Sequence, residues 1–386
     1  MPVWVPLAPW VAAALIMTCV AAPAAASAVR APAGVAFYSP PKRLLAGPHG
    51  SVIWARRVHS PLNATAREYR VLYRSRSIAG KPVAVSGLVD MPRRRAPAGG
   101  WRVVSWGHVT VGVADVCAPS RDPVRITLIP GVYPLFKGLL RRGYVITRTD
   151  YEGLGTRGVH PYLIGRSEGR GMLDIVRAAR HLDSRVGRRL AIGGYSQGGH
   201  AALWAAALAP RWARELDFRG VVTLAPPSHL GTLIRRDPAA TGVLAVAGAA
   251  AVDPAIRLQR VLSDQALALM PHVGRECVFD LARPDEFGAL APSQLFRPGA
   301  DLSRLFGLLA AQNPALRIHA PVLVLQGLAD TLVQPDITDR LVHELKVKGD
   351  AVTYRTYPGV DHFGIVAPSA PATTAFIAAR LRKGRR

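Results

Sequence analysis

The sequence predicts an α/β fold in which helices cover both faces of a mostly parallel sheet. Short apolar runs typical of buried strands recur along the chain, and stretches of helical periodicity lie between most of them. The chain has 386 residues and is 49% hydrophobic, which allows a large core and excludes general disorder.

The first part of the chain predicts an arm, a hairpin and a strand. Residues 29 to about 65 are rich in proline and show little periodicity, which favours an N-terminal arm on the surface. Apolar and polar residues alternate over 67–77 and 83–89, and this pattern predicts an antiparallel hairpin. The apolar segment 101–106 predicts the next strand.

The later elements continue the alternation of strands and helices, with one long interruption. Strands are predicted at 145–149, 190–193, 221–225, 321–327 and 351–357, and helices at 168–182, 200–208, 336–345 and from 371 onward. Over 228–319 helical apolar runs are separated by prolines, which is typical of a helical cap over a site. We therefore expect a core formed by 29–227 and 320–386, with a cap inserted between them.

Residues 1–28 have the pattern of a secretory signal peptide. They contain no charged side chain, include the apolar run 11–17 and end in Ala26-Ser27-Ala28, a small-residue cleavage site. The apolar run is too short to span a membrane comfortably. We therefore expect a secreted protein, either extracellular or associated with the cell envelope.

The chain is strongly basic, with a formal net charge of +24. The basic residues are nearly all arginines scattered along the chain, and no basic run is interleaved with aromatic residues as in a single-strand-binding groove. We expect no specific nucleic-acid partner. The charge is interpreted as a solvated surface that favours peripheral contact with a lipid interface or an anionic envelope.

A candidate nucleophile lies in Gly194-Tyr195-Ser196-Gln197-Gly198, between a predicted strand and an alanine-rich predicted helix. In this pattern a sharp turn exposes the serine hydroxyl to a base on one side and to amide donors on the other. The flanking glycines allow the turn without a Cβ clash. The alternative is an ordinary crossover whose serine caps the helix.

Asp330 and His362 are the candidate acid and base. In α/β-hydrolases the order is serine, acid, histidine, and the last two follow later strands. Asp330 follows the strand 321–327, and His362 follows the strand 351–357. Competing residues lie within or at the ends of helices, or beside His362, and are expected to be exposed or capping or to point elsewhere: His181, His200, His343, Asp336, Asp339 and Asp361.

The loop 107–112 follows an early strand, where α/β-hydrolases place one oxyanion donor. We expect the oxyanion hole to consist of the backbone N–H of Gln197 and that of His108 or Val109.

Taken together, these motifs resemble the secretory lipase family typified by yeast lipase A, especially its actinobacterial members. The motifs are Asp150 to Thr156 with His160-Pro161-Tyr162, Gly194 to Gly199, Gly327 to Asp330, and Gly359 to His362. The resemblance implies an α/β-hydrolase with a helical cap, a Ser196–Asp330–His362 triad, and no metal or organic cofactor.

Two cysteines, Cys117 and Cys277, remain once the predicted signal peptide is removed. An even pair in an exported chain favours one disulfide, and two separate buried thiols are the alternative. The family resemblance implies that these two are bridged, which would join the loop after the early strand to the cap.

The sequence departs from the family pattern in two places. The family loop usually reads Gly-His-Gly-Thr-Thr-Gly, whereas Val109 occupies the second glycine position here. If that position requires a positive φ, valine costs about 1–3 kcal/mol and displaces the donor. The chain also continues for only one predicted helix beyond the His362 loop, so we expect it to lack the C-terminal flap of yeast lipase A.

The predicted function is a secreted serine-dependent carboxylic ester hydrolase, a lipase or esterase. It would act on small-molecule or lipid esters with hydrophobic acyl groups through an acyl-enzyme. A serine peptidase or an acyltransferase with the same triad is one alternative. The other is a catalytically inactive protein that binds the cell envelope.

Overall fold

The computed structural model describes residues 1–3, 31–122, 131–236 and 239–382. The chain divides into two compact units, Met1–Arg30 and Ala31–Arg386. Nearly all of the predicted signal peptide lies outside the described residues. Within the described part, none of the helices combines the length and the apolar character needed to cross a bilayer.

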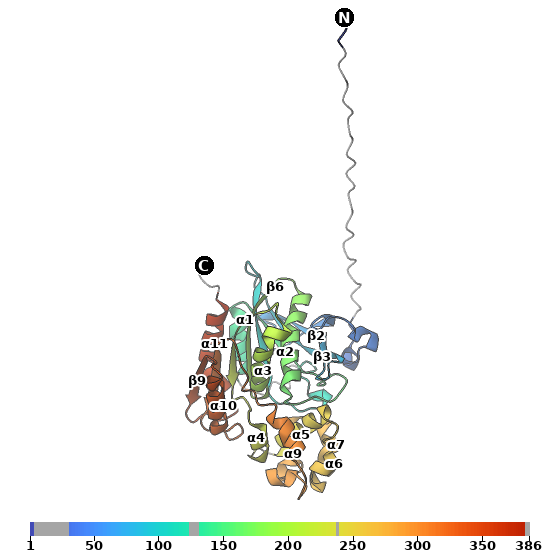
Figure 1. The fold of residues 1–386 in the computed structure, drawn as a ribbon, viewed down its shortest axis with the longest axis vertical. Coiled ribbons are helices and arrows are strands. Elements are labelled where there is room, and N and C mark those ends of the chain that lie inside the picture. Colours follow the sequence, from blue (N-terminus) through green and yellow to red (C-terminus); the bar gives the residue numbers. More distant parts are fainter. Residues whose placement is uncertain (4–30, 123–130, 237–238, 383–386) are drawn as a thin grey trace. The chain divides into compact units, whose positions relative to one another are not determined.

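The second unit is built on one sheet in the strand order β1-β2-β3-β5-β4-β6-β7-β8-β9 (Figure 1). Strands β1, β2, β3 and β5 pair antiparallel, and every pairing from β5 through β4 to β9 is parallel. The bounds are β1 Val52–Val58, β2 Ala66–Arg76, β3 Pro82–Pro92, β4 Trp101–Gly107, β5 Tyr144–Thr149, β6 Val186–Tyr195, β7 Asp217–Leu224, β8 Val322–Gly327 and β9 Val352–Tyr357. The mostly parallel sheet predicted from the sequence is confirmed.

Helices pack on both faces of the sheet: α1 Val132–Arg141, α2 Gly165–Leu182, α3 Gln197–Trp212, α10 Pro335–Val347 and α11 Val366–Leu381. Successive strand residues point to opposite faces, so Val103 packs in the cluster with α2, α3 and α10, while Val104 packs with α1 and α11. Because both faces are covered, the central strands are apolar almost without interruption.

The described residues of 228–319 form a layer of helices, whose apolar core also includes Val113, Leu163 and Ile337 from outside the segment. Its α-helices are α4 Leu230–Arg236, α5 Ala239–Val252, α6 Leu258–Val261, α7 Asp264–Val273, α8 Val278–Leu281 and α9 Ser303–Ala310. Figure 1 shows these helices gathered at one end of the sheet. Leu244, Leu262 and Leu309 are fully buried in their shared core. We call this segment the helical layer.

The disulfide Cys117–Cys277 is present and excludes the alternative of two free thiols. Cys117 ends the 3₁₀ helix η3 Asp115–Cys117, which follows β4, and Cys277 immediately precedes α8. Beside the bridge, the backbone N–H of Val278 donates to the carbonyl of Val111 at 3.0 Å. The bridge therefore joins the sheet to the helical layer, as the family resemblance implied, and spans 160 residues of sequence.

Several elements differ from the prediction, and neither helix α1 nor strand β1 was predicted. Within the predicted N-terminal arm, β1 forms an edge strand beside β2, in addition to the short 3₁₀ helices η1 Gly34–Tyr38 and η2 Lys42–Leu45. A bulge between Val52 and Trp54 breaks the alternation that would have indicated a strand. The last helix begins at Val366 rather than Pro371, which lies inside it. The helix tolerates Pro371 because the proline removes only one backbone N–H donor from the helical hydrogen bonds.

Candidate active site

Ser196 lies on a strained turn between β6 and α3. Its φ of 55° and ψ of −124° are unfavourable for a residue with a Cβ. The turn is held against the neighbouring strand β7, because Ser196 N–H donates to the Leu224 carbonyl at 2.9 Å. A Cβ on Gly194 or Gly198 would collide with neighbouring backbone. The two glycines of the motif are therefore required by close packing.

Three side chains that the sequence singled out form one hydrogen-bonded chain. His362 Nε2 lies 3.0 Å from Ser196 Oγ, and His362 Nδ1 lies 2.7 Å from Asp330 Oδ2. Ser196, Asp330 and His362 are only 8%, 3% and 6% exposed. Because a carboxylate accepts only, the contact with Asp330 places the imidazole proton on Nδ1 and leaves Nε2 to accept from the serine hydroxyl.

Asp330 is fixed by more than the histidine. Its Oδ1 accepts the backbone N–H groups of Leu332 and Val333 at 2.9 and 2.8 Å, and its Oδ2 accepts Gln326 Nε2–H at 3.2 Å. These donors hold the carboxylate in one orientation. His362 is fixed through its backbone, since its carbonyl accepts the Tyr195 hydroxyl at 2.5 Å.

The predicted oxyanion donors lie close to this chain. Gln197 is the first residue of α3, so its N–H has no partner within the helix. The loop after β4 touches the same turn, because a Cβ on Gly198 would collide with the Gly107 and His108 carbonyls. Val109 is not among the residues with positive φ. The strain considered for valine at this position is therefore absent.

An apolar pocket with about 100 Å³ of free space opens beside Ser196 and His362. Most of its lining is aliphatic and comes from α4, α5 and the loops after β4, β7, β8 and β9. Phe279 of the helical layer and Phe363 also line it, with ring centroids 6.3 Å apart, and they are 48% and 46% exposed. The pocket suits an apolar group attached to the atom that Ser196 attacks.

A second polar cluster, which the sequence analysis missed, lies behind the turn. Glu168 of α2 is fully buried and accepts the Leu163 N–H at 3.0 Å and Gln197 Nε2–H at 2.7 Å. His200 Nδ1 lies 3.4 Å from the same carboxylate. Burial raises the pKa of Glu168, but the contacts with His200, His160 and Gln197 outweigh burial and lower it overall. The residue after the nucleophile is thus tied to a buried carboxylate.

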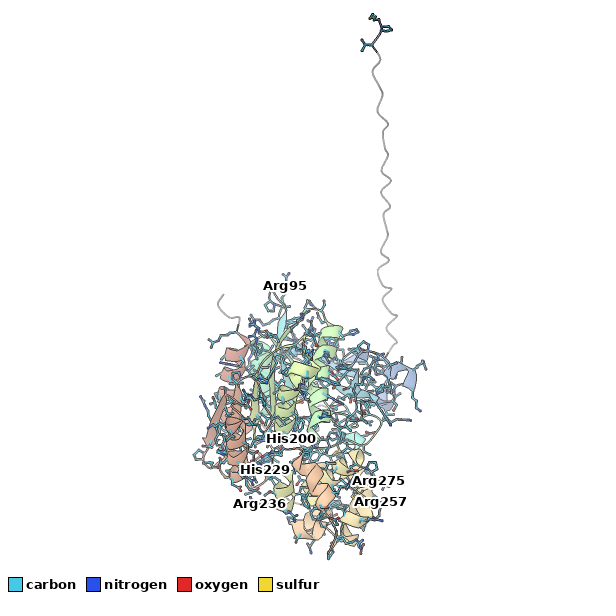
Figure 2. All side chains as sticks on the ribbon, viewed as in Figure 1. Arg95, His200, His229, Arg236, Arg257 and Arg275 are labelled. Carbon is cyan, nitrogen blue, oxygen red and sulfur yellow. A yellow bond between two sulfur atoms is a disulfide. The ribbon has the colours of Figure 1, made fainter. Side chains whose placement is uncertain are left out.

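His200 corrects one expectation. We expected an exposed or capping side chain, but His200 is fully buried at the start of α3 (Figure 2). Its Nε2 lies 2.9 Å from the carbonyl of Gln312, just beyond α9. A polar residue at a helix start is usually exposed, and here the helical layer covers it.

Acid should destabilise the fold through His160. This histidine is fully buried, and burial lowers its pKa to about 4. In the unfolded chain His160 has its ordinary pKa of 6.5 and binds a proton below that pH. In the folded protein His160 binds this proton only below about pH 4. The free energy of unfolding should therefore fall as pH drops through this window, by up to roughly 3 kcal/mol.

Denaturant unfolding at pH 7 and at pH 5 tests this prediction. His160→Asn keeps a donor that can replace Nδ1, which lies 2.9 Å from the Glu152 carbonyl, but it cannot titrate. The variant should lose less stability than the wild type between the two pH values. Equal losses would contradict the assignment.

A possible metal-binding set among the described residues lies away from this site. His272, Glu276 and Glu286 of the helical layer bring potential ligand atoms within 4.8 Å of one another. Arg283 lies 3.7 Å from Glu276 and 3.9 Å from Glu286. This cation already neutralises part of the acidic charge that a metal ion would require.

Comparison with known proteins agrees with this geometry. The family model of secretory lipases matches residues 132–385. The chain belongs to the secretory lipase family. The resemblance stated from the motifs is thus confirmed, and lipases such as those of this family are carboxylic ester hydrolases.

Individual relatives are distant. Lipase A of Moesziomyces aphidis is 29% identical over 206 residues, which cover 51% of this chain and 42% of lipase A, less than half its length. A Mycobacterium tuberculosis protein named a probable inactive lipase is 26% identical over 374 residues, covering 89% of this chain and 81% of that protein.

The fold has solved counterparts. A crystal structure of Candida antarctica lipase A in its closed state superposes with a TM-score of 0.77 at 22% identity, covering 89% of this chain and 85% of that one. This match confirms the α/β-hydrolase fold expected from the sequence.

Proposed function

We propose that the protein is a secreted lipase or esterase that hydrolyses hydrophobic acyl esters through an acyl-enzyme on Ser196. The observation that carries the proposal is the hydrogen-bonded chain Ser196–His362–Asp330, which opens into an apolar pocket. The family contributes the reaction class, and the geometry contributes the roles of the residues.

In the first half-reaction the Ser196 oxygen attacks the ester carbonyl while its proton passes to His362 Nε2. The carbonyl oxygen becomes an oxyanion, which the N–H of Gln197 and one from His108 or Val109 stabilise. Collapse of this intermediate breaks the bond between the acyl carbon and the alcohol oxygen. His362 returns its proton to the departing alcohol, and the acyl group remains on Ser196.

The second half-reaction repeats these steps with water. His362 takes a proton from water, the resulting hydroxide attacks the acyl carbon, and the acid leaves as the proton returns to Ser196. Asp330 orients the imidazole and stabilises the imidazolium that forms twice in each cycle. The chemistry therefore needs no group beyond these side chains and amides.

The lining and the size of the pocket are arguments for two parts of the proposal. The first is an apolar acyl substrate, and the second is movement of the helical layer. The free space of about 100 Å³ is small compared with a long acyl chain. Part of the lining comes from α4 and α5, so outward movement of the helical layer would enlarge it. We propose that this layer is the cap inferred from the sequence. Export, for which the family name and the 1–28 pattern argue, is part of the same proposal.

Labelling of the purified protein with a fluorophosphonate probe tests the mechanism. The wild type should be labelled and Ser196→Ala should not, because only an activated serine reacts with the probe. Turnover of p-nitrophenyl esters but not of aminoacyl-nitroanilides would separate an esterase from a peptidase. Product analysis with an added alcohol would reveal an acyltransferase.

A protein that binds the envelope without catalysis is the second candidate, because one relative covering most of the chain is named a probable inactive lipase. A folded wild type that resists the probe, even with detergent present to open the helical layer, would favour this candidate and contradict the esterase proposal.

A further inference from the structure

A basic groove lies where the amino ends of the central strands meet, at the end of the sheet opposite the candidate active site. It is lined by the loop 95–100, by residues that begin β4, β6 and β7, and by the segment 184–189 with Arg180. Its free space is about 740 Å³. Because β4, β6 and β7 are parallel, their amino ends form this groove, while their carboxyl ends lead to Ser196.

The lining of the groove is dominated by arginine. Its arginines are Arg95, Arg102, Arg180, Arg185, Arg188 and Arg189, and its single carboxylate is that of Asp217. Six positive charges and one negative charge give the lining a formal charge of +5. This concentration on one concave surface differs from the scattered charge that the linear sequence indicated.

Several of these guanidinium groups are available to a ligand. Arg185 pairs with Asp183 at 2.6 Å, and Arg189 with Asp217 at 3.4 Å. Among the described residues Arg95, Arg102 and Arg188 have no hydrogen-bonded or ion-paired acid. Burial and the charge of Arg188 lower the pKa of Arg180. An anion would relieve the repulsion between these like charges.

The shape and the lining of the groove narrow the class of anion. None of the large apolar side chains exposed in the described residues lines it, so it lacks the anchors that a membrane surface would require. Its one aromatic residue, Trp101, is buried beneath Arg185 at 5.1 Å and cannot stack on a base. A concave surface of guanidinium forks instead fits a flexible chain of phosphates.

We propose that this groove binds a soluble linear polymer with closely spaced phosphate groups, and that binding leaves the active-site pocket at the opposite edge of the sheet open to substrate. The arginine-lined groove would then hold the enzyme on a polyanion, and the polyanion would not block the entrance to the pocket beside Ser196.

Binding of long-chain inorganic polyphosphate to the full mature protein tests the proposal. The groove variant is Arg95→Gln/Arg188→Gln, which removes two exposed arginines that have no acidic partner in the described part of the chain. The matched control is Arg257→Gln/Arg275→Gln, which removes the same charge from exposed sites in the helical layer. Figure 2 shows Arg95 at one end of the described body and Arg257 and Arg275 at the other.

The groove variant should bind polyphosphate about tenfold more weakly or worse, and its log–log salt slope should fall by roughly two. The control should keep the affinity of the wild type. Both variants should unfold like the wild type and hydrolyse a p-nitrophenyl ester at its rate, so failure here is distinct from failure of the proposed catalysis.

Three results would overturn the proposal. Equal weakening in both variants would mean that net charge alone binds the polymer. Tighter binding to phosphatidylglycerol vesicles than to polyphosphate, lost in the groove variant, would identify a membrane surface instead. Tighter binding to a single-stranded oligonucleotide of matched charge would identify a nucleic-acid site.

Discussion

Asp330→Asn should lower kcat on a p-nitrophenyl ester by about 10⁴-fold with little change in KM. The amide would donate a hydrogen bond to His362 Nδ1, where the carboxylate now accepts one at 2.7 Å. The imidazole proton would then move to Nε2, which could no longer accept from Ser196. Substrate binding in the apolar pocket would be unaffected, so the loss should fall on kcat.

Asp361→Asn is the matched control, because it makes the same change beside the same histidine. Asp361 is exposed and accepts only the Gly364 N–H at 2.7 Å among the described residues. Its kcat should stay close to that of the wild type. A similar fall in both variants, or no fall in Asp330→Asn, would remove Asp330 from the proposed mechanism.

Glu168→Ala should lower both stability and kcat. The carboxylate is fully buried, and its removal leaves the Leu163 N–H and Gln197 Nε2–H without an acceptor. The free energy of unfolding should fall by about 3 kcal/mol. Gln197 would keep only the contact of its amide with His160 Nε2 at 3.0 Å, so its backbone donor should shift, lowering kcat by about 10²-fold while KM changes little.

Two further variants separate positioning from a general loss of stability. Glu168→Gln retains an acceptor and the shape of the side chain, so it should recover much of both losses. Glu286→Ala removes another buried acid, one paired with His272 in the helical layer at 2.5 Å. It should destabilise the protein without changing kcat. If Glu286→Ala lowers kcat as strongly as Glu168→Ala does, Glu168 has no specific positioning role.

Ser196, Asp330 and His362 could be predicted because each follows a strand whose apolar pattern is clear in the sequence. Parallel strands bring their carboxyl ends to one edge, so order and position alone placed Ser196, Asp330 and His362 near one another. The pairing of Cys117 with Cys277 came from the family resemblance, since spacing alone cannot specify a bridge.

The Glu168 cluster was harder to predict. Glu168 shares a helical stripe with the buried residues Met172, Ile175 and Val176, and an acid on such a stripe was the available signal. Helical periodicity predicts that a side chain is buried. It does not predict which residue of another helix forms a hydrogen bond with that side chain. For the same reason the burial of His200 was not predicted, because the segment that contacts its side chain, at Gln312, lies more than a hundred positions away in the sequence.

The insertion of the helical layer between β7 and β8 has a consequence for synthesis. The nucleophile and its turn are made early, but Asp330 and His362 belong to segments that join the sheet only after the helical layer has emerged. A chain that stops within the layer contains Ser196 but neither Asp330 nor His362, so in the proposed mechanism its serine has no base. If the proposed mechanism holds, ester turnover reports that the chain is complete through His362.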